Sequence, residues 1–160
     1  MRASGIVDRM TLSDTRRRLT IDRVTTSHYI ATNPRGGAIS VGDGSDTTFT
    51  PVELLLAAIG GCTAIDVDLV TSRRAEPDSF QVVVEADKVR DDEGNHLTGI
   101  EVTFRIAFPA GEGGDAARDI LPRIVRQSHD RLCTVSRTVE RGTAVAARIE
   151  PAALPAGIPP

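Results

Sequence analysis

The segment TPVELLLAAIGGCTA, residues 50–64, decides the fold of this chain of 160 residues. Three signals predict that a helix begins here: Thr50 is a suitable N-cap, Pro51 suits the first helical position, and Glu53 completes a capping box. The run over residues 54–65 is apolar nearly all round. A helix of that kind is expected to be buried between other layers of the fold.

Cys62 lies within this apolar run, and the only other cysteine is Cys133. Burial raises the pKa of a thiol, so a reactive Cys62 requires a nearby cation or several hydrogen-bond donors. Arg137, four residues after Cys133, either favours a Cys133 thiolate or is an ordinary exposed arginine. The alternative to a redox pair is a buried structural cysteine and a lone thiol at a helix end. The residues alone leave both interpretations open.

Strands are expected on both sides of the apolar helix. Residues 18–32 are rich in β-branched side chains and predict two strands or one bent strand, and residues 38–41 predict a short strand. Residues 80–89 and 99–108 predict a strand pair joined through a turn at residues 91–95. Apolar side chains alternate in the second strand of that pair, which indicates one buried face.

The last third of the chain predicts helices and a final strand. Apolar spacing favours a second helix over residues 115–132, in which Pro122 is tolerable only in the first turn or two. Residues 133–140 predict a short helix or turn, and residues 143–149 predict a strand. The whole chain is interpreted as one domain.

Composition indicates a soluble domain, with 40% hydrophobic residues, 26% charged residues and a net charge of −3. We expect a core over about residues 18–149, and loosely ordered tails at residues 1–15 and 151–160. Aromatic residues make up only 3%, and no basic stripe is present, so no nucleic-acid partner is expected. No apolar run approaches the roughly 18 residues of a membrane span. No signal peptide or metal-ligand spacing is found either, so we expect a cytoplasmic protein with neither membrane nor metal partner.

Two cysteine motifs resemble those of the OsmC/Ohr family of organic hydroperoxide reductases, in particular its OsmC-like branch. The first is T-P-x-E-L-L-L-A-A-x-G-G-C-T-A at residues 50–64, and the second is S-H-D-x-x-C-x-V-S-R at residues 128–137. The resemblance spans about residues 18–149. It implies an α+β fold and an intertwined homodimer, in which two long central helices are wrapped by sheets from both chains and the active sites lie at the interface.

The resemblance also implies a chemistry. In the peroxidases of the family, one cysteine attacks an organic hydroperoxide and becomes a sulfenic acid, and a second cysteine resolves it as a disulfide. A dithiol such as dihydrolipoamide then reduces the disulfide, and no bound cofactor takes part. By resemblance, Cys62 is the peroxidatic cysteine and Cys133 the resolving one. Alkyl or lipid hydroperoxides are the implied substrates.

The sequence departs from the family pattern at the activating residues. The peroxidases hold an arginine beside the cysteine with a glutamate ten residues before it, where this chain has Val52. Glu53 lies about 100° further round the helix and is either that glutamate or only a capping residue. Arg35 is the first candidate for the arginine and Arg23 the second, although both also fit exposed positions. The departure leaves open an alternative, a non-enzymatic ligand-binding or thiol-sensing dimer.

Overall fold

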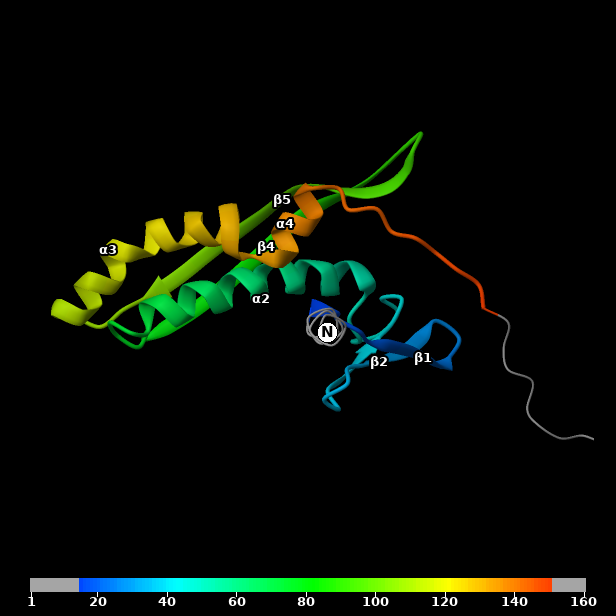
Figure 1. The fold of residues 1–160 in the computed structure, drawn as a ribbon, viewed down its shortest axis with the longest axis horizontal. Coiled ribbons are helices and arrows are strands. Elements are labelled where there is room, and N and C mark those ends of the chain that lie inside the picture. Colours follow the sequence, from blue (N-terminus) through cyan, green and yellow to red (C-terminus); the bar gives the residue numbers. More distant parts are fainter. Residues whose placement is uncertain (1–14, 151–160) are drawn as a thin grey trace, which may run out of the picture. The chain divides into compact units, whose positions relative to one another are not determined.

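The structure is a computed structural model that describes residues 15–150 (Figure 1). Its elements, in chain order, are the strands β1 (Thr20–Thr25), β2 (His28–Thr32) and β3 (Ala38–Val41), helix α2 (Pro51–Thr71), the strands β4 (Ser79–Asp91) and β5 (Gly94–Ala107), helix α3 (Glu112–Gln127), the π-helix η1 (Ser128–Leu132) and helix α4 (Thr134–Glu140). Helices and two sheets in one chain confirm the predicted α+β class.

The described residues form two compact units. Unit 1 contains residues up to 60 together with residues 83–103, and unit 2 contains residues 61–82 together with those from 104 onward. Helix α2 and the strands β4 and β5 contribute to both units. The predicted tails fall on residues 1–14 and 151–160, outside the described part of the chain, apart from residue 15.

Unit 1 contains a three-stranded antiparallel sheet in the order β1-β2-β3. The predicted two strands in residues 18–32 and the short third strand are confirmed. Ser27, with a φ of 61°, makes the tight turn between β1 and β2. The turn before β3 is closed by Asn33, whose side-chain oxygen accepts hydrogen bonds from the backbone N–H groups of Arg35 and Gly37 at 2.9 and 3.2 Å.

Helix α2 begins with the predicted capping box. The Glu53 carboxylate accepts hydrogen bonds from the backbone N–H and the hydroxyl of Thr50 at 2.7 and 2.8 Å. The backbone N–H of Glu53 donates to the Thr50 hydroxyl in return, at 3.3 Å. At the other end, the guanidinium of Arg74 donates to the carbonyl of Val70 at 2.9 Å, which satisfies a C-terminal carbonyl of the helix.

The prediction that α2 is buried on all sides is wrong for the single chain. Only 28% of its most apolar 18-residue window is buried, and Ile65 and Leu69 are 62% and 58% exposed. Helix α2 is long enough and apolar enough to cross a membrane, whereas we expected no such segment from the sequence. Core helices of soluble proteins can have the same length and mean hydropathy. The described residues therefore leave much of the apolar circumference of α2 exposed.

The strands β4 and β5 are longer than predicted, because their turn needs only residues 92 and 93. The Asp91 carboxylate accepts the backbone N–H groups of Glu93 and Gly94 at 2.9 and 3.1 Å, and Gly94 has a φ of 121° that favours glycine. Within unit 2, Phe80 and Phe104 pack edge to face with ring centroids 6.4 Å apart.

The second helix differs from its prediction in two ways. Pro122 lies in its interior rather than in the first two turns; its side chain is exposed, while Ala117 and Ile124 are buried and hold the helix by packing. The regular helix also ends at Gln127, because the next five residues form the π-helix η1. A hydrogen bond of 2.9 Å from the backbone N–H of Cys133 to a carbonyl five residues earlier closes η1.

The predicted strand at residues 143–149 is absent. This segment has no regular structure, and Val145 and Ile149 are 95% and 100% exposed. A strand requires a hydrogen-bonding neighbour, and none of the described strands pairs with this segment. The predicted short helix before it is confirmed as α4.

Candidate functional site

The structure brings the two cysteines together within unit 2. Cys62 lies in the fourth turn of α2, and Cys133 occupies the N-cap of α4, directly after η1. Both thiols are free, and they are hydrogen-bonded to each other. Cys133 is fully buried, whereas Cys62 is partly accessible. A pair with one accessible and one enclosed sulfur suits a reaction that begins at Cys62.

Of the two cysteine sulfurs, the Cys133 sulfur has more hydrogen-bonding groups around it. As the N-cap of α4, its Sγ accepts a hydrogen bond of 3.4 Å from the backbone N–H of Ser136. The Ser136 hydroxyl oxygen lies 3.2 Å from the same sulfur. The Thr63 hydroxyl and the Cys62 thiol also hydrogen-bond to it. The protonated Cys133 thiol donates to the Ser136 hydroxyl. Once ionised, the sulfur accepts from that hydroxyl as well as from the other three donors, and these four hydrogen bonds favour the thiolate.

The pKa values of the two thiols move in opposite directions. Burial is the largest cause that raises the pKa of Cys62, and the neighbouring Cys133 sulfur raises it further. Backbone N–H groups of Val135 and Thr134 oppose this effect only in part. Burial also acts to raise the pKa of Cys133, but the combined hydrogen bonds from Ser136, Cys62 and Thr63 outweigh it and lower that pKa. These opposite shifts favour Cys133 over Cys62 as the thiol that loses its proton first.

The second cysteine motif contributes a further contact. The hydroxyl of Ser128, at the start of η1, donates to the carboxylate of Asp66 on α2 at 2.7 Å. The sequence singled out neither residue for this role, and it did not single out Thr63 or Ser136. The sequence signal that could have pointed to Ser128 and Ser136 is the second cysteine motif, residues 128–137, to which both belong.

The other predicted site residues belong to unit 1. The Glu53 carboxylate is engaged by Thr50, and these hydrogen bonds hold its pKa below its usual range. Arg35 is exposed on the turn that precedes β3, and the Arg23 guanidinium donates to the Thr26 hydroxyl at 3.0 Å. The structure thus assigns Glu53 a capping interaction.

Arg137 lies on α4 in unit 2, where its backbone N–H donates to the Cys133 carbonyl at 3.1 Å, while its side chain forms an ion pair. Its guanidinium is 3.7 Å from the Glu140 carboxylate, and His129 approaches the same carboxylate at 3.4 Å. Among residues 15–150, no cluster of three or more His, Cys, Asp or Glu side chains is arranged to hold a metal ion.

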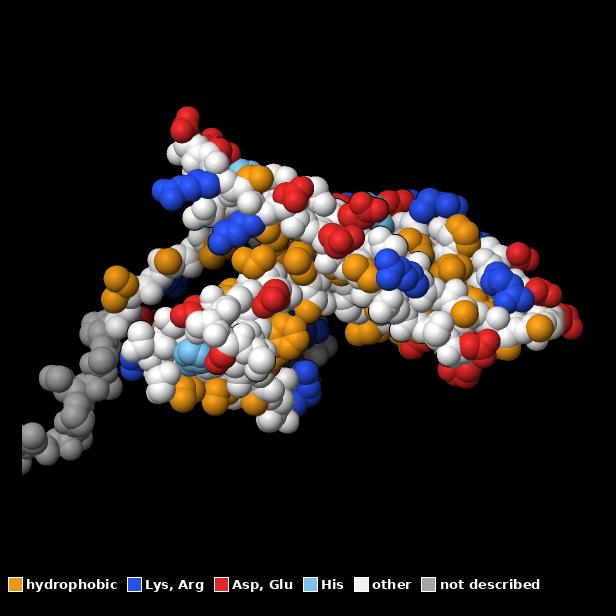
Figure 2. All heavy atoms as spheres, turned by 180° about the vertical axis from the view of Figure 1, so that it is seen from behind, with side chains coloured by type: hydrophobic (Ala, Val, Ile, Leu, Met, Phe, Trp, Pro, Cys, Tyr) orange, Lys and Arg blue, Asp and Glu red, His pale blue; other side chains and the backbone are white. Residues whose placement is uncertain are grey.

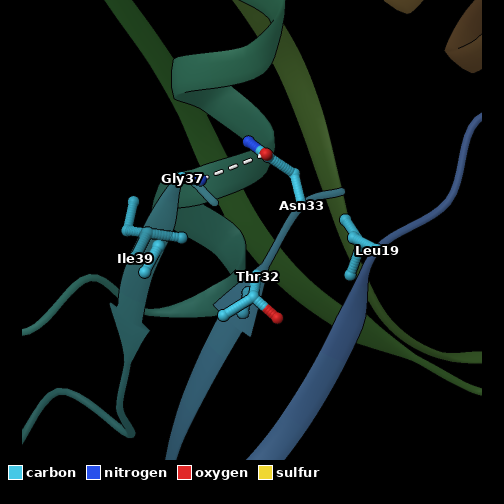
Figure 3. A pocket seen from close by; sticks show the side chains of 7 residues that line it. Leu19, Thr32, Asn33, Gly37 and Ile39 are labelled. Atoms are coloured by element: carbon cyan, nitrogen blue, oxygen red, sulfur yellow. Dashed lines mark hydrogen bonds between the residues drawn. The ribbon is translucent and has the colours of Figure 1, made fainter. Parts of the chain in front are cut away.

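The structure also contains a shallow pocket of about 290 Å³ in unit 1 (Figure 3). Its walls come from the end of the three-stranded sheet and the turn closed by Asn33, and its lining residues are Leu19, Ala31, Thr32, Asn33, Gly37, Ala38 and Ile39. Its side chains are apolar or uncharged, so it offers no acid, base or nucleophile. We assign the chemistry to the cysteine pair instead.

Comparison with known proteins identifies the family of this chain. The family model described as OsmC-like protein matches residues 42–148. An uncharacterized protein of Mycobacterium tuberculosis is 31% identical over 128 residues, which cover 79% of this chain and 91% of the relative.

Solved structures share the fold. An OsmC-like protein of unknown function from Vibrio cholerae has a TM-score of 0.63 at 12% identity, over 79% of this chain and 94% of that one. An organic hydroperoxide resistance protein from Elizabethkingia anophelis has a TM-score of 0.52 at 14% identity, over 78% and 89% of the two chains. With the family model matched across both cysteine segments, this chain belongs to the OsmC-like protein family.

Proposed function

We propose that the protein reduces organic hydroperoxides with its two thiols. The observation that carries this proposal is the hydrogen-bonded pair of Cys62 and Cys133, one partly accessible and the other buried among donors. Membership of the OsmC-like family supports it, as does the fold shared with an organic hydroperoxide resistance protein.

In this mechanism Cys133 first acts as a base. Its thiolate accepts the proton of the Cys62 thiol, to which it is already hydrogen-bonded, as the Cys62 sulfur attacks the outer oxygen of the hydroperoxide. The O–O bond breaks, and the outer oxygen stays on Cys62 with its proton as a sulfenic acid. The inner oxygen leaves as an alkoxide, which takes a proton from solvent water and becomes the alcohol. Sulfur loses two electrons, and the peroxide gains them. Thiolate character is thus supplied to Cys62 by its neighbour.

The second step forms the disulfide. The Cys133 sulfur, losing its proton again, attacks the Cys62 sulfenic acid, and the hydroxyl group leaves as water. An external dithiol then attacks the disulfide and becomes a cyclic disulfide while both cysteines are reduced. A compact dithiol such as dihydrolipoamide fits this step, and the chain then needs no bound cofactor. A reducing cytoplasm is the compartment that suits such a cycle.

We also propose that the protein acts as a homodimer. Apolar side chains reach the surface over much of the visible face in Figure 2. In unit 1, Leu19, Ile21 and Val24 are 58%, 60% and 56% exposed. In unit 2, Ile65 and Leu69 are 62% and 58% exposed. So many large apolar side chains are unusual on a monomer. A second copy that covers α2 would explain why so apolar a helix is exposed in one chain.

A second candidate function is a slow thiol sensor. The observation that favours it is the raised pKa of Cys62, together with Val52 at the position where the family carries its glutamate. None of the groups that set this pKa is an arginine or a lysine. In that case oxidation of the pair would report peroxide without sustained turnover.

Stopped-flow oxidation of the reduced protein by cumene hydroperoxide separates the two functions. The peroxidase predicts rapid loss of both thiols, a disulfide between Cys62 and Cys133 in mass spectrometry, and steady turnover with a dithiol. Cys62→Ser should abolish the reaction. Cys133→Ser, which lacks both the base and the resolving thiol, should react more slowly with peroxide, but it should accumulate a sulfenic acid and keep part of the turnover when excess monothiol is supplied. Equal activity of both variants would contradict the proposal. Oxidation no faster than that of a free thiol would favour the sensor.

A further inference from the structure

The contact between Asp66 and Ser128 joins two segments that are far apart in sequence. The Ser128 hydroxyl donates to the Asp66 carboxylate at 2.7 Å across a separation of 62 residues. Ser128 is fully buried, and Asp66 is half-buried. A hydrogen bond to a carboxylate in such a place is stronger than one between neutral groups.

The position of Asp66 on α2 relates this contact to the cysteine pair. Asp66 follows Cys62 by four residues, so both side chains lie on the same face of the helix, one turn apart. Thr63, on the same turn as Cys62, hydrogen-bonds to the Cys133 sulfur. One stripe of α2 therefore makes three polar contacts with the segment that carries the second cysteine.

Ser128 has a second connection, through its backbone. Its carbonyl accepts the hydrogen bond of 2.9 Å from the backbone N–H of Cys133 that closes η1. The residue that is anchored to α2 by its side chain is thus the residue that fixes the backbone of Cys133. Without the hydrogen bond between Ser128 and Asp66, η1 would keep its internal hydrogen bonds but would no longer be held in a fixed position against α2.

We propose that Asp66 and Ser128 are a positioning pair, which holds the Cys133 turn against α2 so that the two sulfurs meet for disulfide formation. Neither residue touches the reacting atoms. The step they assist forms the S–S bond between the two cysteine sulfurs and releases the sulfenic hydroxyl as water. Positioning of this kind raises the effective concentration of one thiol at the other.

The test compares this contact with a matched one on the same helix. Asp66→Ala, Ser128→Ala and the double variant remove the anchor. Asp68→Ala and Ser72→Ala remove a contact of the same chemistry, since the Ser72 hydroxyl donates to the Asp68 carboxylate at 2.7 Å within α2. Asp66→Asn keeps the shape of the side chain and leaves an amide oxygen as a weaker acceptor. It replaces Asp66→Ala as the test variant if the alanine variant fails to fold.

The first readout is the equilibrium between the reduced pair and the disulfide in a dithiothreitol redox buffer. Loss of a hydrogen bond to a carboxylate corresponds to a change of about tenfold, so the disulfide of the Asp66→Ala protein should be about tenfold easier to reduce. Asp66→Asn should fall between this variant and the wild type. The double variant should match the single variants rather than add to them. The Asp68 and Ser72 variants should keep the wild-type equilibrium.

The second readout is trapping of the Cys62 sulfenic acid with dimedone after a pulse of cumene hydroperoxide. Slower disulfide closure should raise the fraction of oxidised Cys62 that dimedone traps in Asp66→Ala, even where displacement of the Cys133 base also slows the peroxide step. Lower thermal stability with an unchanged dithiol equilibrium would overturn the positioning role. This second readout rests on the proposed peroxidase, whereas the first does not. A wild type inert to peroxide, with a shifted equilibrium in Asp66→Ala, would refute the peroxidase and keep the positioning pair.

Discussion

Replacement of Ser136 by alanine tests whether Cys133 holds the negative charge of the pair. The hydroxyl that would be removed lies 3.2 Å from the Cys133 sulfur, and Ser136 and Cys133 are 8% and 0% exposed, so water does not replace it readily. A hydrogen bond to a charged group contributes about 1.5 to 3 kcal/mol. Sulfur is a weak acceptor, so the lower end applies. At about 1.36 kcal/mol per pKa unit, the pKa of Cys133 should rise by about one unit.

The assay is a spectrophotometric titration of thiolate absorbance in the reduced protein. The two cysteines titrate as a pair in two steps, and Ser136→Ala should move the lower step upward by that amount. Thr138→Ala is the matched control, because it removes from the same helix a hydroxyl that donates to a backbone carbonyl at 2.7 Å. An unchanged lower step in Ser136→Ala would refute the assignment of the charge to Cys133.

The same substitution has a consequence for stability. The folded-state pKa of Cys133 is below its ordinary value, so the thiolate stabilises the folded protein at pH values above the unfolded-state pKa. This contribution disappears as the pH falls through the folded-state pKa. Because Ser136→Ala brings the two pKa values closer together, the gain in stability of reduced protein between neutral and alkaline pH should shrink relative to the wild type, as measured by urea unfolding at each pH.

Further predictions concern the fold around the site. Thr50→Ala should cost about 1 kcal/mol of unfolding free energy in urea, because α2 loses its N-cap. Gly114→Ala should lower the melting temperature strongly, since a Cβ would overlap the Pro109 carbonyl oxygen, whereas Gly61→Ala, with open space around it, should be neutral or stabilising. A dimer disrupted by Gly61→Ala in light scattering would instead show that the partner packs there. In an NMR titration, the pKa of His28 should lie above 6.5, because its ring hydrogen-bonds to a backbone carbonyl and an aspartate; a value below 6.5 would contradict this.

Much of the fold was predictable because its signals are local. The start of α2 depends on four adjacent residues that satisfy one another's hydrogen bonds, and Glu53 does in the structure what the capping box predicts. The first three strands follow from β-branched side chains and an Asn-Pro-Arg-Gly-Gly turn. The predictions that were wrong required information from elsewhere. Residues 143–149 have strand composition but no described strand beside them, and the expected burial of α2 required covering surfaces that the described residues do not supply.

The candidate site shows the same division between local and distant information. The cysteines were predicted as a pair only by resemblance, because a separation of 71 residues carries no distance. What the sequence alone did not reveal is the order of their acidities. Apolar neighbours in sequence made Cys62 the conspicuous thiol, yet those neighbours raise its pKa, while the donors that create a thiolate gather on Cys133. Two of those donors, the Thr63 hydroxyl and the Cys62 thiol, belong to α2, which is far from Cys133 in sequence. The more accessible sulfur and the sulfur whose pKa is lowered are therefore different atoms. In the proposed mechanism, transfer of the proton from the first to the second is the step that activates the accessible thiol.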